Sequence, residues 1–137
     1  MPDDVILAKV EIIERCLQRI QEEYAGTPSH LHENWTRQDS ILLNLERACQ
    51  ASIDLALRLV TMKNLGLPKE SREAFDLLAA AGLLEVALAQ AMQRMVGFRN
   101  LAVHNYRKLD LKIVQAIVET RLGDFAMFCR RGLELAG

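Results

Sequence analysis

Four side chains that could take part in chemistry lie close together in one stretch of the sequence: Arg99, Asn100, His104 and Tyr106. A histidine whose pKa is near neutrality can take a proton from a ribose 2′-hydroxyl or give one to a leaving oxygen. An arginine can hold a phosphate through two parallel hydrogen bonds and offset the charge that develops on it. Asn100 can orient His104 or donate to a phosphate oxygen. Arg99 and His104 are therefore candidates for cleaving RNA without a metal ion.

The element that must position these side chains is a helix beginning near Leu84. Its predicted apolar stripe advances in alternating steps of four and three residues through Leu88, Met92, Met95, Arg99, Ala102 and Tyr106. Arg99 takes the place of an apolar residue, and because an unpaired buried charge is costly, a carboxylate or a phosphate must accompany it. Asn100 and His104 neighbour each other, but Arg99 and His104 lie about 140° apart around an ideal helix. They can meet at one ligand through the reach of Arg99, a bend at Gly97, or a second subunit.

Helical spacing also predicts the elements before this segment. A first helix carries apolar residues from Ile6 to Tyr24 at spacings of three and four, and Asp3 or Asp4 can cap its start. Residues 25–34 contain turn formers without periodicity and are predicted to form a loop. A long central helix is expected from about Arg37 to Asn64, capped by Thr36 together with Asp39.

Two further helices complete the prediction. A short one runs from Ser71 to Ala81 and is stopped by Gly82, and a last one is capped by Asp110. The predicted apolar face of the last helix consists of Ile113, Ile117, Leu122, Phe125 and Phe128. The chain of 137 residues is half hydrophobic and only 5% aromatic. Residues 1–137 are therefore expected to form a single all-α domain, a bundle of four long helices with an additional short helix.

Charge and cysteine usage narrow the class of protein. The net charge of −1 does not by itself indicate a nucleic-acid binder, yet residues 94–112 carry five basic residues against the one acid Asp110. Cys16, Cys49 and Cys129 are odd in number and widely spaced, which favours buried thiols in a reducing cytosol over a disulfide framework. No signal peptide or membrane-length apolar run is found, so we expect a cytoplasmic protein that does not enter the membrane.

The segment 95–106, Met-Val-Gly-Phe-Arg-Asn-Leu-Ala-Val-His-Asn-Tyr, resembles the Arg-x4-His-x-Tyr signature of HepT-like HEPN ribonuclease toxins. The segment 39–47, Asp54 and the Asp-capped last helix agree with this resemblance, which covers essentially the whole chain. It implies a HEPN-type helical bundle that dimerises so that two Arg-x4-His motifs face a shared cleft. Arg99 and His104 would then be the catalytic residues of a metal-independent endoribonuclease, with Asn100 in support and no cofactor.

The resemblance also implies partners. Toxins of this family are paired with an MntA-type nucleotidyltransferase antitoxin that transfers AMP to the motif tyrosine, here Tyr106. The substrate would be RNA, either tRNA or mRNA, and added AMP groups would repel RNA phosphates from the cleft.

Other interpretations of the same residues remain open at this point. Arg99 could pair with Asp54 or Glu46 inside the bundle, His104 could be a structural histidine, and Tyr106 could be core. The pair His30 and His32 invites a metal site, which we reject because no cysteine or carboxylate cluster accompanies it. The alternative function is a non-catalytic helical subunit that binds a minimal nucleotidyltransferase and serves as its substrate. A third is a bundle that binds RNA without cleaving it.

Overall fold

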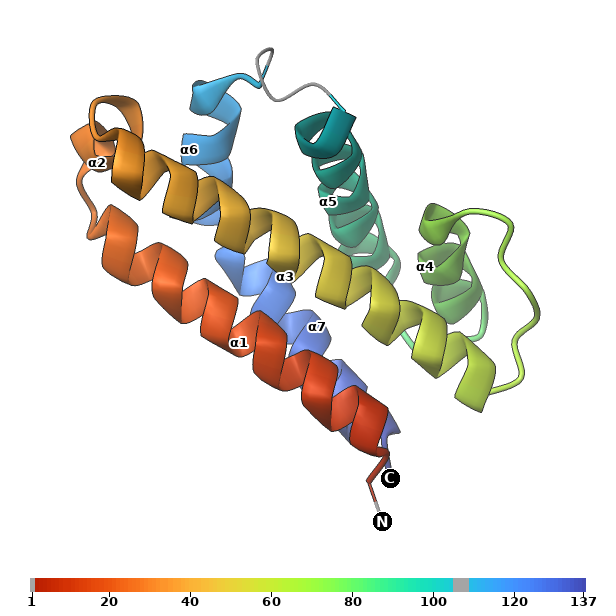
Figure 1. Cartoon of the computed structure of the whole chain (residues 1–137). Helices are drawn as coiled ribbons and strands as arrows, with labels where there is room; N and C mark the ends of the chain where they lie inside the picture. Colours follow the sequence, from red (N-terminus) through yellow and green to blue (C-terminus); the bar gives the residue numbers. More distant parts are fainter. Residues whose placement is uncertain (1, 105–108) are drawn as a thin grey trace.

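The computed structural model describes the backbone of residues 2–104 and 109–137, and all side chains of these residues except those of Val103 and His104. Every regular element in these ranges is a helix (Figure 1), which confirms the predicted all-α fold. The helices are α1 (Asp4–Tyr24), α2 (Pro28–His32), α3 (Trp35–Met62), α4 (Ser71–Ala80), α5 (Val86–His104), α6 (Leu111–Thr120) and α7 (Leu122–Leu135).

The long helices α1 and α3 form the most extensive contact, and α7 packs against both of them (Figure 1). The side chain of Asp3 accepts a hydrogen bond from the Ile6 amide at 3.1 Å, so the predicted cap of α1 is confirmed. Asp3 also binds Arg58 of α3, and its amide donates to the carbonyl of Ala136 beyond α7. The two ends of the described chain therefore meet at one end of the bundle.

The start of α3 differs from the prediction. Asn34, rather than Thr36, caps the helix by accepting a hydrogen bond from the Arg37 amide at 3.0 Å, so the helix begins earlier than expected. The predicted loop 25–34 is also wrong in part, because its middle forms the short helix α2. Proline at the first position favours such a turn, and burial of Leu31 stabilises it.

The last predicted helix is in fact two helices, broken at Arg121, whose φ of −120° is not helical. The break lets α6 pack against α1 and α2 while α7 packs against α1, α3 and α5. The predicted face is therefore divided between two helices, which share α1 as a neighbour. Ile117 and Phe125 are buried as predicted, but Ile113 is 51% exposed, so its assignment to that face was wrong.

Polar contacts attach α6 to the α1–α2 corner. The Tyr24 hydroxyl donates to the Glu119 carboxylate, and burial together with this acceptor raises the pKa of Tyr24 to about 12. His32 Nε2 lies 2.6 Å from the Gln115 side-chain oxygen, and His30 Nδ1 donates to the Tyr24 carbonyl at 2.9 Å. The two histidines thus have structural partners, and the described residues contain no group of three metal-ligating side chains.

The three cysteines are free and buried in the core, as predicted from their apolar contexts. Burial disfavours the charged thiolate, so the pKa of each thiol is raised, that of Cys129 to about 12. None of these thiols is suited to act as a nucleophile. No helix in the described ranges has the length and apolar character needed to cross a membrane.

Candidate active site on helix α5

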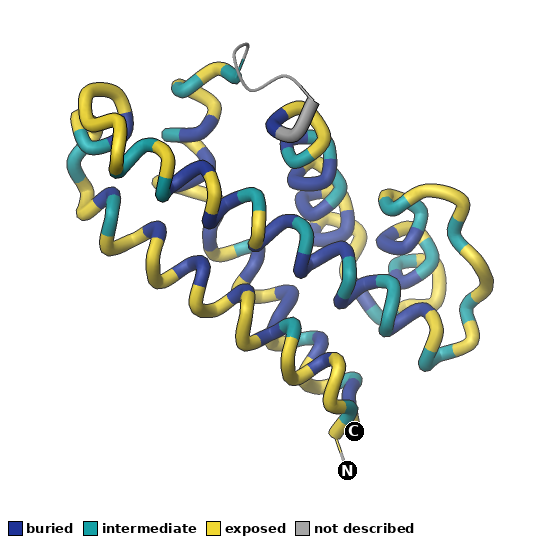
Figure 2. The backbone as a smooth tube through the Cα atoms, viewed as in Figure 1, coloured by how far each residue is buried: buried dark blue, intermediate teal, exposed yellow. Residues whose placement is uncertain are grey.

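The buried side of α5 follows the predicted stripe. Leu88, Met92, Met95 and Ala102 are each no more than 8% exposed, and Arg99 lies among them as a half-buried residue. Figure 2 shows buried residues recurring along one side of this helix. The packing of α5 against α3, α4 and α7 holds that side inward. The helix therefore carries a guanidinium into a position that its own pattern reserves for an apolar side chain.

The guanidinium of Arg99 is incompletely satisfied. Its Nη1 donates to the side-chain oxygen of Asn100 at 3.1 Å, whereas its Nε is buried and finds no hydrogen-bond partner in the described part of the protein. A buried donor without an acceptor costs about 1–3 kcal/mol. Such a donor is expected where an acceptor arrives from outside the subunit, as a substrate oxygen would.

The proposed structural partners of Arg99 do not take up this donor. The Asp54 carboxylate accepts hydrogen bonds from Lys9 at 3.1 Å and from Gln50 at 3.0 Å. Glu46 borders a cavity of about 260 Å³ between α3 and α5, which Ala102 lines one turn beyond Arg99. Among the described residues, no ion pair joins Arg99 to Asp54 or Glu46.

Cys49 of α3 reports on the electrostatics beneath the site. Burial raises the pKa of this thiol, the positive charge of Arg99 lowers it, and the carboxylate of Glu46 raises it. Arg99 and Glu46 are thus both close enough to Cys49 to act on it. A fixed positive charge stands at the α3–α5 boundary, with a carboxylate nearby that limits the cost of keeping it there.

Asn100 and His104 lie in the last turns of the described part of the same helix. Asn100 is exposed, and α5 continues through Gly97 as an unbroken α-helix as far as the structure describes it, to His104. Helical spacing therefore places Asn100 and His104 along one face and leaves Arg99 about 140° away from His104. The bend considered at Gly97 does not interrupt the helix. The side chain of His104, and Tyr106 with the basic residues Arg107 and Lys108, lie outside the described side chains.

The combination of residues is suited to phosphodiester chemistry. Arg99 offers an unmet donor and a permanent positive charge for a phosphate oxygen. Asn100 adds an amide at the exposed side, and His104 follows one turn later along that side. By helical spacing, positions 99 and 104 lie on different sides of α5, so either the reach of Arg99 or a second subunit could bring both groups to one phosphate.

Comparison with known proteins identifies the family. A family model described as "Ribonuclease HepT-like" matches residues 13–131, which is most of the chain. The chain belongs to the HepT-like ribonuclease family. Over 126 residues it is 43% identical to the mRNA nuclease HepT of Shewanella oneidensis, covering 92% of this chain and 94% of that protein.

Solved structures of HepT-like toxins share the fold. One is the tri-AMPylated Shewanella oneidensis HEPN toxin in complex with MNT antitoxin, at a TM-score of 0.88 and 42% identity, covering 94% of this chain and 96% of the other. Another is a toxin–antitoxin structure with AMP-PNP, at a TM-score of 0.89 and 41% identity, covering 94% and 97%. The predicted HEPN-type fold and the predicted membership of a ribonuclease family are confirmed.

Sequence reasoning missed two features around the site. Cys49 was treated only as core, although it lies within electrostatic range of Arg99. The exposed apolar pair Leu101 and Ile113 was also missed, because the sequence does not reveal the break that turns Ile113 away from the core. The exposed position of Leu101 could have been found, since it falls off the α5 stripe by helical spacing.

Proposed function

We propose that this HepT-like protein is the toxin of a toxin–antitoxin system and acts in the cytoplasm as an endoribonuclease that cleaves mRNA. Its catalytic residues would be Arg99 and His104, with Asn100 in support. The observation that carries the proposal is the buried Nε of Arg99, which has no partner among the described residues and stands five residues before His104 in a ribonuclease family member. The curated Shewanella relative is named an mRNA nuclease, which favours mRNA over tRNA.

The cleavage step follows from the side chains available. His104 takes the proton of the ribose 2′-hydroxyl, and the 2′-oxygen attacks the adjacent phosphorus while the bond to the 5′-oxygen breaks. The imidazolium formed in this way gives a proton, directly or through water, to that leaving oxygen, so the products are a 2′,3′-cyclic phosphate and a 5′-hydroxyl. Arg99 stabilises the extra charge on the phosphoryl oxygens. Neither group requires a metal ion for these roles.

The active unit is a homodimer. Because Arg99 and His104 lie about 140° apart on a continuous helix, a two-fold axis is the simple way to bring both types of side chain to one phosphate.

Control of the toxin would come from a nucleotidyltransferase of the MntA type, which transfers AMP from ATP to Tyr106. The solved Shewanella toxin is described as tri-AMPylated and bound to its MNT antitoxin, which supports this assignment. Tyr106 follows His104 by two residues, so AMP attached there would place bulk and negative charge where RNA phosphates must bind.

The experiment that tests the function is the substitution His104→Ala, with His32→Ala as a matched control. We expect H104A to abolish growth arrest and to slow cleavage of mRNA in vitro by at least about 10²-fold, because proton transfer is lost. Circular dichroism and light scattering should show an unchanged fold and dimer, and H32A should stay fully toxic. A toxic H104A protein would refute the proposal. Protein that accepts AMP but cleaves no RNA would be the non-catalytic substrate subunit instead.

A further inference from the structure

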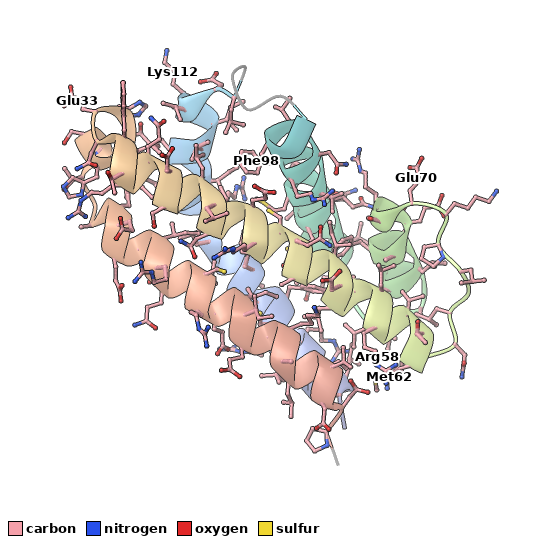
Figure 3. The ribbon with its side chains drawn as sticks, in the orientation of Figure 1. Glu33, Arg58, Met62, Glu70, Phe98 and Lys112 are labelled. Atoms are coloured by element: carbon pink, nitrogen blue, oxygen red, sulfur yellow. The ribbon has the colours of Figure 1, made fainter. Side chains whose placement is uncertain are left out.

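A groove of about 610 Å³ runs between α5 and α6, beside the candidate active site. Phe98 and Leu101 contribute from α5, and Ile113 contributes from α6. Figure 3 labels Phe98 and Lys112, which come from the two walls. Leu101 is 43% exposed and Ile113 is 51% exposed, so apolar surface is left open to water on both sides. The volume lies within the range of sites that hold small organic groups.

The charge around this groove has one sign. Arg94, Lys112 and Arg121 lie at its border, and none of its described lining residues is acidic. Arg94 and Lys112 are exposed and form no ion pair within the described ranges, while Arg121 stands 4.0 Å from Asp124. The groove thus combines an apolar floor with cations that are mostly free to bind an anion.

A second groove provides a contrast at the opposite end of α5. It has a volume of about 430 Å³ and also contains arginines, Arg130 and Arg131. There, however, Glu85 and Glu134 balance the charge, and Arg131 is already bound to the Leu83 carbonyl at 2.7 Å. Of these two grooves, only the α5–α6 groove has cations at its border that no acidic lining residue balances.

These properties favour an anionic occupant over a second copy of the chain. A two-fold contact centred on the groove would place two like-charged borders against each other, which is unfavourable. Proteins that bind single-stranded nucleic acid combine cations along the phosphates with side chains that pack beneath the bases, aromatic ones most strongly. By helical spacing Leu101 lies about 60° from position 104 around α5, so a strand held at His104 passes close to this groove.

We propose that the α5–α6 groove binds the RNA nucleotide next to the cleaved phosphate, with its base against Leu101 and Ile113 and phosphates on Arg94 and Lys112. This inference rests on the proposed function, since it assumes an RNA substrate. It assigns to the groove the role of selecting single-stranded RNA, because a base paired in a duplex cannot turn into it.

The test measures binding of 2′-O-methyl RNA, which lacks the attacking hydroxyl and cannot be cleaved. A mixed-sequence oligonucleotide is titrated with the full-length protein by fluorescence anisotropy at several salt concentrations. For the double variant R94Q/K112Q, we expect the slope of log affinity against log salt to fall by about 1.4, since each lost phosphate contact removes about 0.7. The double variant L101A/I113A should bind about fivefold or more weakly with an unchanged slope.

Arg130→Gln is the matched control, because it removes an exposed arginine from the charge-balanced groove and should change neither slope nor affinity. RNA affinity of R94Q/K112Q equal to that of the wild type would overturn the proposal. A Leu101→Asp variant that is monomeric would also overturn it, because the groove would then be a subunit interface. If R94Q/K112Q loses only its nucleotidyltransferase partner, the groove binds protein and the proposal also fails. Failure of the wild-type protein to cleave unmodified RNA would instead refute the proposed function itself.

Discussion

Arg99 occupies a position where an apolar side chain would stabilise the bundle more than a guanidinium does. Its neighbours on the stripe, Met95 and Ala102, are buried, and its Nε has no acceptor in the described structure. Residues that lower the stability of the folded protein in this way are typical of functional sites. The anomaly at Arg99 is visible in the sequence from the spacing of apolar residues alone. The missing hydrogen-bond acceptor is not visible in the sequence, because it depends on which side chains Asp54 and Glu46 of α3 contact in the folded protein.

The substitution Arg99→Met separates function from stability. We expect R99M to raise the free energy of unfolding by about 1 kcal/mol, or about 3 °C in Tm, because it removes a buried unpaired donor and keeps the volume. The same variant should lose RNA cleavage by at least about 10²-fold. Urea denaturation and an in vitro cleavage assay measure the two effects, with the exposed Arg130→Met as control. A loss of more than about 1 kcal/mol in R99M would mean that Arg99 is bound within the bundle.

Asp3 links helices α1 and α3 at the end of the bundle away from the site. Its carboxylate caps α1 through the Ile6 amide and binds Arg58 of α3. The hydrogen bonds from Arg58 lower the pKa of Asp3 below its ordinary value of 3.8. A carboxyl group whose pKa is lowered by folding stabilises the native state above its ordinary pKa, and this contribution is lost as the pH falls through the lowered pKa.

The variant Asp3→Asn tests this coupling, because asparagine still caps a helix but carries no charge. At pH 7 we expect D3N to be less stable than the wild type in urea denaturation. The difference should shrink as the pH falls below about 3.8, where protonation of the wild-type Asp3 with its lowered pKa removes the same charge. Asp4→Asn, at an exposed neighbour, serves as the control. A difference between D3N and wild type that stays constant with pH would contradict this account.

The helices themselves differ in how well the sequence predicts them. The Asp3 cap of α1 and the Asp110 cap of α6 were predicted, because the chemistry of a cap is local. The helix α2 and the break at Arg121 were not predicted, because both depend on tertiary packing. Leu31 becomes buried only when α2 packs against its neighbours. The chain can change direction between α6 and α7 because α6 packs against α1 and α2.

The whole-molecule question is how two copies share one site. Positions 99 and 104 lie on different sides of α5, so a single subunit can bring both groups to one point only through the long reach of Arg99. The sequence predicted this separation, and the unbroken α5 agrees with it. In a symmetric dimer, each site can combine Arg99 of one subunit with His104 of the other, or take both side chains from one subunit.

Mixing two inactive variants resolves the pairing. If each site combines Arg99 of one subunit with His104 of the other, R99A and H104A mixed through unfolding and refolding should recover about a quarter of wild-type cleavage. Half of the dimers would then be mixed, and each would hold one intact site. Either variant refolded alone serves as the control and should stay inactive. No recovery in the mixture would mean that both groups act from the same subunit.

Because all three thiols are buried in the core, none of the cysteines is accessible to a reagent while the protein is folded. A maleimide or iodoacetamide reagent meets neither an accessible sulfur nor a ready thiolate while the bundle stays closed. Alkylation therefore proceeds only as fast as the helices come apart, and three residues on α1, α3 and α7 can be read separately by mass spectrometry. The rate at which the natural cysteines are alkylated therefore measures how often the bundle opens.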